Sequence, residues 1–174
     1  MRIVGLVFGL AALGFASTAF ADDVSLTPVS YSPQFQTALT DNYGLREGEY
    51  LQVSVTRAVS AALARRGVTL SSDAPISIDI SIVDAQPNAP TMAQLFHTPG
   101  LDPIRSVSIG GAQLRAVLRD AQGEQIGEVN HRRYNYSIEE YRGLRPTTWQ
   151  EADWAIQQFA QKVADAYVAH QGAH

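Results

Sequence analysis

The stretch ISIDISI, residues 76–82, constrains the fold more than any other part of this 174-residue chain. Its four isoleucines occupy every second position, and serine or aspartate fills the positions between them. Because successive side chains of a β-strand point to opposite faces, this strand has one apolar face and one polar face. The apolar face has to be covered by a second layer of structure. The alternation therefore predicts a sheet with one buried face and one face open to water.

Two amphipathic helices are predicted to supply the covering layer. The first runs from Leu45 to Arg66, where apolar residues recur at helical spacing, and Gly67 follows as a stop signal. The second begins near Thr148, whose spacing from Glu151 is typical of a capping box, and it continues to the C-terminal tail. Each helix carries a single apolar stripe, so both are expected to pack on the same face of the sheet.

Further strands are predicted on both sides of the isoleucine strand. Residues 22–33 are rich in β-branched and aromatic side chains but are interrupted by Pro28, which is typical of an edge strand. Residues 105–136 are predicted to form a β-hairpin, with turn-forming residues at positions 120–123. Ile126 and Val129 lie three positions apart, so a bulge is expected if both face inward. The pair Gly110-Gly111 indicates another bulge or a close approach of backbone.

The order of these elements predicts a fold of the α+β class. We expect a two-layer sandwich, with two amphipathic helices on one face of a mixed sheet of about four strands. Without residues 1–21 the chain has 174 − 21 = 153 residues, which suits one domain with a substantial core. Residues 22–174 are therefore expected to form a single domain.

The first 21 residues have the order of a secretory signal peptide. Arg2 precedes an apolar run that ends near Phe15, and small residues stand at the cleavage positions Ala19 and Ala21. We expect cleavage after Ala21; the alternative is an uncleaved membrane anchor. Small exported eukaryotic domains usually need disulfides and this chain has no cysteine, so a bacterial periplasm is the predicted location.

Cleavage would leave a mildly acidic protein with no integral membrane segment. Removing Arg2 leaves 12 basic and 17 acidic residues, a net charge of −5. Nucleic-acid binding depends on clustered cationic charge that displaces counterions from the phosphates. Nucleic acid is therefore not expected as a partner.

A segment punctuated by four prolines, residues 85–104, joins the isoleucine strand to the hairpin. Thr91 is placed to cap one short helical turn, MAQLF, that puts Met92, Leu95 and Phe96 on one side. One interpretation is that the segment plugs an open end of the sandwich through Leu95, Phe96 and Leu101. The other is that it forms a lid over a groove or partner surface. The residues nearest to that surface would be Phe96, His97 and Arg105.

Catalytic chemistry is not indicated by any motif. The chain has no nucleophile elbow, no phosphate-binding loop and no paired carboxylates at suitable spacing, so we predict no catalytic residue, metal or cofactor. The main alternative is a hydrolase acting on an envelope substrate. It would require His97 or His131 to meet a carboxylate such as Asp84 or Asp102 in a pocket. Another alternative is a structural or stress-related exported protein without a fixed ligand.

The segment HRRYNY, residues 131–136, mixes arginine with tyrosine. One interpretation is a solvated, salt-bridged end of a strand. The other is a surface that binds an anionic or glycan partner. The contacts would then be Arg132, Arg133 and Tyr136.

Several segments together resemble a known kind of protein. The helix end AALARRGV, the hairpin LRAVLRDAQGEQIGEV and the closing helix WAIQQFAQKVADAY resemble small periplasmic α/β modules of bacterial envelope proteins. Examples are the N-terminal domain of TolB and the auxiliary lipoproteins of envelope transport. The segment PNAPTMAQL resembles the signature of an uncharacterised exported family. The resemblance implies a non-catalytic periplasmic module that binds an envelope protein or another envelope component.

Overall fold

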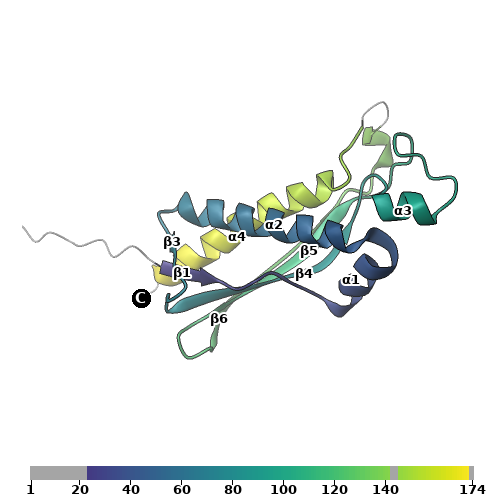
Figure 1. Cartoon of the computed structure of the whole chain (residues 1–174). Coiled ribbons are helices and arrows are strands. Elements are labelled where there is room, and N and C mark those ends of the chain that lie inside the picture. Colours follow the sequence, from purple (N-terminus) through teal and green to yellow (C-terminus); the bar gives the residue numbers. More distant parts are fainter. Residues whose placement is uncertain (1–22, 142–144, 173–174) are drawn as a thin grey trace, which may run out of the picture.

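The computed structural model describes residues 23–141 and 145–172 (Figure 1). The predicted signal peptide and its cleavage site lie outside the described residues. The two long helices, α2 (Leu45–Ala64) and α4 (Gln150–Gln171), pack against each other on one face of a mixed sheet. The predicted two-layer α+β sandwich is confirmed.

Within the residues that the structure describes, the sheet has six strands rather than about four. Its order is β3-β1-β4-β5-β6, and β2 also pairs with β4. The strands with their bounds are β1 (Asp23–Leu26), β2 (Ser30–Tyr31), β3 (Thr69–Leu70), β4 (Ile76–Gln86), β5 (Gly111–Arg119) and β6 (Gln125–Tyr134). β1, β2 and β3 run parallel to the strands they pair with. β5 is antiparallel to both of its neighbours, β4 and β6.

One extra strand arises where the sequence suggested a single edge strand, and the other, β3, follows α2. The chain around Pro28 leaves the sheet between β1 and β2, so residues 22–33 contribute two short strands instead of one. The edge assignment is wrong for β1, which lies between β3 and β4, whereas β2 pairs with β4 alone in the described part of the chain. β3 has two residues, which are too few to show alternation in the sequence. It pairs with the outer side of β1 and so covers that edge.

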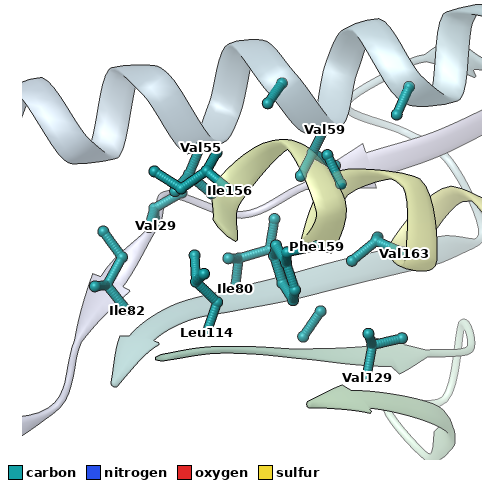
Figure 2. Close-up of a cluster of buried hydrophobic side chains, with 14 of the residues drawn as sticks. Val29, Val55, Val59, Ile80, Ile82, Leu114, Val129, Ile156, Phe159 and Val163 are labelled. Atoms are coloured by element: carbon teal, nitrogen blue, oxygen red, sulfur yellow. The ribbon is translucent and has the colours of Figure 1, made fainter. Parts of the chain in front are cut away.

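The core lies between the sheet and the two long helices (Figure 2). Ile78, Ile80 and Ile82 are buried on the helix face of β4, and Ile76 is half-buried at the start of the strand. Phe159 and Ile156 of α4 lie on the same side of the sheet as Ile80 and Ile82 (Figure 2). Burying one such side chain contributes about 1.5–3 kcal/mol, so this alternation is a principal source of stability. Other buried members of the core include Val55, Val59, Leu114, Val129 and Val163.

The opposite face of the sheet is polar, as the alternation predicts. Arg119 of β5 pairs with Asp79 of β4 at 2.7 Å, and Arg115 of β5 pairs with Glu128 of β6 at 2.9 Å. These side chains are partly exposed, so the pairs contribute little to stability.

The β5–β6 hairpin contains the predicted bulge. The pairing register shifts between Leu118 and Arg119, and Ile126 is the extra residue on β6. This shift lets Ile126 pack against the core together with Val129. A second irregularity, at Val83 of β4, was not predicted. It returns Ala85 to the buried face and leaves Asp84 on the open face.

The remaining helical segments are short. Between β2 and α2 the chain forms α1 (Pro33–Ala38) and a π-helical turn, η1 (Leu39–Tyr43). The proline-punctuated segment contains α3 (Met92–His97). Thr91 caps α3, and the Gln94 side chain returns to the Thr91 backbone, so the predicted cap is confirmed. The 3-10 turn η2 (Ile138–Tyr141) follows β6.

The predicted capping box of α4 is wrong. The helix begins after Trp149, and no side chain at that position caps it. The Glu151 carboxylate is buried and bonded to Arg133 and Tyr141, so it does not reach back to Thr148 as a capping box requires. The side-chain oxygen of Asn88, from the segment before α3, accepts the Glu151 backbone N–H at 2.9 Å. A residue distant in sequence therefore takes the role that Thr148 was expected to fill.

Candidate binding pocket at helix α3

An open pocket of about 580 Å³ lies where α3 meets the beginnings of α2 and α4. Three segments that are far apart in sequence, residues 43–50, 92–93 and 147–149, form its walls. In Figure 1 this is the end of the sandwich that carries α3, away from the labelled C-terminus. The lining residues are Tyr43, Gly44, Leu45, Arg46, Glu47, Tyr50, Met92, Ala93, Thr147, Thr148 and Trp149.

Trp149 forms the buried part of the pocket wall. Its side chain packs edge-on against Tyr43, with ring centroids 5.8 Å apart and planes at 90°. Its indole N–H donates to the Glu47 carboxylate at 2.6 Å. Burial, followed by the charge of Asp84, raises the pKa of Tyr43 above its ordinary value. The buried part of the wall is therefore aromatic, and of the two charged lining residues, Arg46 and Glu47, Glu47 already accepts a hydrogen bond from Trp149.

The rim of the pocket exposes large apolar side chains. Leu45 is 59% exposed and Met92 is 62% exposed. Phe96, one helical turn after Met92, is 78% exposed. We call Leu45, Tyr50, Met92 and Phe96 the apolar rim. Burying such residues would be favourable by about 1.5–3 kcal/mol each, so their exposure marks a surface suited to a partner.

Tyr50 combines an exposed ring with a fixed hydroxyl. The hydroxyl donates to the Asp153 carboxylate of α4 at 2.9 Å. Burial and this hydrogen bond raise the pKa of Tyr50. Burial also raises the pKa of Asp153, although the Tyr50 hydrogen bond opposes the shift. The pair links α2 to α4 at the edge of the pocket and orients the Tyr50 ring.

The position of α3 is set by close packing at Gly44. This residue has φ of 96°, a left-handed conformation that favours glycine, and a Cβ there would lie 3.3 Å from the Ala93 Cβ. Gly44 is also the residue before α2. The missing side chain therefore lets α3 approach the start of α2 and close one side of the pocket.

Behind the pocket, a buried polar cluster fixes the segment that carries α3. The Asn88 side chain accepts from the Glu151 N–H and donates to the Tyr141 hydroxyl at 3.2 Å. The Glu151 carboxylate, which has no exposed surface, accepts from the Tyr141 hydroxyl, from Asn135 and from Arg133. We call these five residues the Asn88 cluster. It joins four separate segments of chain at the root of α3.

Burial favours the neutral, protonated form of Tyr141 in the Asn88 cluster. Burial, with the hydrogen bond to Glu151 second, raises the pKa of Tyr141 to about 12. The phenol therefore stays protonated and donates at every physiological pH. Buried polar groups are costly unless they are hydrogen-bonded, and here each has a partner. The cluster thus anchors the segment that carries α3 through hydrogen bonds.

The two adjacent glycines before β5 are explained by close approach. A Cβ at Gly110 would lie 2.2 Å from the Asn88 side-chain oxygen. A Cβ at Gly111 would lie 2.2 Å from the Arg133 carbonyl oxygen and would also meet the Tyr134 ring. The ring of Tyr134 can therefore pass over Gly111 and donate its hydroxyl to Asp84 on β4. The predicted close approach of backbone is confirmed.

The predicted residues of the α3 segment differ in their distance from the pocket and in their exposure. Met92 lines the pocket, and Phe96 extends the apolar rim beyond it. Leu95 and Leu101 are half-buried, whereas His97 and Arg105 are exposed and do not line the pocket. The exposure of Phe96 contradicts the interpretation that this side chain plugs the sandwich. The segment instead forms one wall of a pocket.

The residues predicted at the end of β6 are not brought together. Arg133 points to the helix side, where it pairs with Glu151 and lies 5.3 Å from the centre of the Trp154 ring. Arg132 lies on the open face, 4.7 Å from the centre of the Tyr134 ring, and donates to the Tyr136 hydroxyl at 3.1 Å. The two arginines therefore face opposite sides of the sheet, and only Arg132 and Tyr136 share a surface.

Three of the residues that a hydrolase would require, Asp84, Asp102 and His131, contact partners other than one another. Asp102 accepts from the backbone N–H groups of Ile104 and Arg105 and holds a turn. Asp84 accepts from Tyr134. His131 Nδ1 lies 3.1 Å from the Lys162 amine, on the helix side of β6. None of these residues lines the pocket, nor does His97.

Tyr43, Tyr50 and Trp149 were not predicted as site residues. Tyr50 could have been suspected, because it interrupts the polar face of an amphipathic helix. The other two are aromatic residues in connecting segments, and only the three-dimensional contact of residues 43 and 149 shows their role. Within residues 23–141 and 145–172, no cluster of metal-ligating side chains and no helix long and apolar enough to span a membrane is found.

Known proteins resemble this chain in structure rather than in sequence. No protein-family model matches the chain, and no curated protein matches its sequence. A DUF330 protein of Xanthomonas campestris matches in structure with a TM-score of 0.50 and 10% identity, covering 88% of this chain and 89% of that one. A minor lipoprotein of Acinetobacter baumannii matches with a TM-score of 0.40 and 13% identity, covering 87% and 95%. At such identity the likeness to the Xanthomonas protein shows a shared fold alone.

Proposed function

We propose that the protein is a non-catalytic binding module of the bacterial envelope. In this proposal the pocket at α3 and its apolar rim receive an amphipathic helix of a partner protein. The observation that carries the proposal is the exposure of Met92 and Phe96 beside a pocket whose wall is formed by Tyr43 and Trp149. Such exposure has a cost in a free protein, and a partner would offset it.

A helix is the occupant that the polar groups of the pocket favour. The Trp149 indole N–H is bonded to Glu47, and the Tyr50 hydroxyl is bonded to Asp153. These groups are therefore not free to satisfy the backbone of an extended peptide. A helix satisfies its own backbone and can place apolar side chains at i, i+3, i+4 and i+7 into such a surface.

The position of the charged groups supports binding rather than catalysis. Glu47 lines the pocket and Asp153 is bonded to the lining residue Tyr50, and each carboxylate accepts a hydrogen bond from an aromatic residue. A general acid or base needs a free proton-transfer path to the substrate. The location in the envelope is supported by the predicted signal peptide.

Site-specific photo-crosslinking in the periplasm of the native host tests the proposal. A photoreactive amino acid placed at Phe96 is expected to give one discrete adduct with an envelope protein. The matched control places it at Gln122, which is exposed in the hairpin turn at the other end of β5. The adduct from position 96 should also disappear when Met92 is changed to Asp. Equal adducts from both positions, or an adduct that survives Met92→Asp, would overturn the proposal.

A further inference from the structure

Strand β6 forms an edge of the sheet with ten residues and no proline. In the described part of the chain it pairs with β5 alone. Figure 1 shows it as the outermost strand, with the two long helices above the sheet. Long unpaired edges offer backbone donors and acceptors to any second strand. The question is which strand the chemistry of this edge would select.

The outward-facing backbone groups of β6 can be assigned from the ladder. The Asn135 N–H donates to the Gly110 carbonyl, so residues 110 and 135 form a hydrogen-bonded pair. Hydrogen-bonded and non-hydrogen-bonded pairs alternate along an antiparallel ladder. Position 134 and the even-numbered positions before it in the ladder therefore direct N–H and C=O away from β5. They are Glu128, Asn130, Arg132 and Tyr134.

We infer that β6 pairs antiparallel with β6 of a second copy of this chain, about a two-fold axis at Asn130. In this register Glu128 lies opposite Arg132 of the second copy, and Arg132 lies opposite its Glu128. Both residues lie on the open face of the sheet and are exposed. Each copy therefore contributes one carboxylate and one guanidinium to two identical cross-strand pairs.

The charges of Glu128 and Arg132 favour this register over those in which the axis is moved along β6 by one or two residues. An axis at Glu128 would oppose two carboxylates, and an axis at Arg132 would oppose two guanidinium groups; like charges directly opposite are destabilising. Axes at Val129 or His131 would leave Glu128 and Arg132 opposite neutral residues. Only the axis at Asn130 pairs both charges. The inference is independent of the pocket at α3, because that pocket has no lining residue in β6.

Both charged side chains are exposed on the open face, although each already has neighbours within its own chain. Glu128 already accepts from Arg115, Gln125 and Asn130, and these hydrogen bonds lower its pKa to about 2. It is therefore ionised at any pH at which the protein would be studied. Arg132 is held over the Tyr134 ring, which fixes its guanidinium on the open face. Charged residues often protect an edge from pairing, but the signs here are complementary about one point.

A charge-exchange experiment tests the inference. Glu128→Arg alone places arginine opposite arginine, and Arg132→Glu alone places glutamate opposite glutamate. Each variant is expected to be monomeric at concentrations at which the natural protein is dimeric by sedimentation velocity. An equimolar mixture of the two variants restores both opposite-charge pairs and should form a heterodimer. Native mass spectrometry can identify that heterodimer, because the two variants differ in mass.

A backbone variant separates pairing from charge. The Asn130 N–H points away from β5, so Asn130→Pro leaves the β5–β6 ladder intact and removes a donor at the proposed axis. It should abolish the dimer, whereas Asn130→Ala should retain it. Circular dichroism checks that both variants fold. A natural protein that stays monomeric at about 100 μM, a dimer that survives Asn130→Pro, or a mixture that forms no heterodimer would each overturn the inference.

Discussion

The side-chain oxygen of Asn88 accepts a hydrogen bond from the backbone N–H of Glu151 at 2.9 Å, although the two residues are 63 positions apart. This bond caps α4 from outside the helix. It also fixes the segment before α3, because the Asn88 backbone donates to the Thr148 carbonyl at 2.7 Å. The start of α4 and the root of α3 are therefore held as one unit, and the pocket lies between them.

Asn88→Ala should destabilise the protein. The change leaves the Glu151 N–H without its acceptor and the Tyr141 hydroxyl without one of its donors. Each buried group left unpaired costs about 1–3 kcal/mol, so we expect a loss of about 3 kcal/mol in the free energy of unfolding. Urea denaturation measures this loss. Asn42→Ala, at an exposed position in η1, is the matched control and should stay within about 0.5 kcal/mol. Equal effects of the two changes would contradict the role of Asn88.

Glu151→Gln should also be destabilising. The Arg133 guanidinium would keep a hydrogen-bonding partner but lose its counter-charge. Arg133 retains 29% of its side-chain exposure, so we expect about 1–2 kcal/mol rather than the larger cost of a fully buried unpaired charge. A double-mutant cycle with Arg133→Gln measures the coupling. Additive effects would show that the ion pair contributes nothing.

Gly111→Ala should be destabilising for a steric reason. The new Cβ would lie 2.2 Å from the Arg133 carbonyl oxygen, and backbone on the next strand cannot move away cheaply. We expect a loss of about 2–3 kcal/mol, measured by thermal denaturation. Gly127→Ala is the control, because its Cβ would meet Leu118 only at 3.7 Å. Similar melting temperatures for both variants would contradict the close approach at Gly111.

His131 should make stability depend on pH. Burial, and then the charges of Lys162 and Arg133, lower the pKa of His131 in the folded protein. As pH falls, His131 therefore takes up a proton in the unfolded chain at a higher pH than it does in the folded protein. The stability that the folded protein gains from neutral His131 is fully present above about pH 6.5. It is lost progressively as pH falls from there to the pKa of His131 in the folded protein.

The His131 effect can be isolated by substitution. His131→Gln should reduce the loss of stability between about pH 7.5 and pH 5.5, measured by urea denaturation at each pH. His97→Gln, on the exposed side of α3, is the matched control. If the His131 variant keeps the same pH profile as the natural protein, neutral burial of His131 is contradicted.

The layers of the fold could be predicted because periodicity records burial. The alternation at residues 76–82 and the stripes of α2 and α4 identify the faces that pack together, whatever the order of the strands. The two-residue strands β2 and β3 could not be predicted, because two residues show no period. The bulge at Val83 could not be predicted either, since its neighbours Ile82 and Asp84 are compatible with an unbroken strand.

The candidate site was predicted only in part. Met92 and Phe96 were identified because Thr91 and the prolines mark a short helix whose apolar side lacks an evident partner. Trp149 and Tyr43 were missed because their contact joins connecting segments about a hundred positions apart. The capping box at Thr148 was wrongly predicted because Glu151 has a second possible use, as a buried partner of Arg133, that local spacing does not reveal.

The most direct test of the account is the affinity of the partner crosslinked at position 96. Isothermal titration with the purified partner should compare the natural protein with Met92→Asp and with the exposed control Gln122→Asp. A charge at the centre of the apolar rim should weaken binding at least about tenfold, which corresponds to about 1.4 kcal/mol, while the control should bind as the natural protein does. Equal affinities for all three proteins would contradict the claim that the pocket at α3 is the binding site.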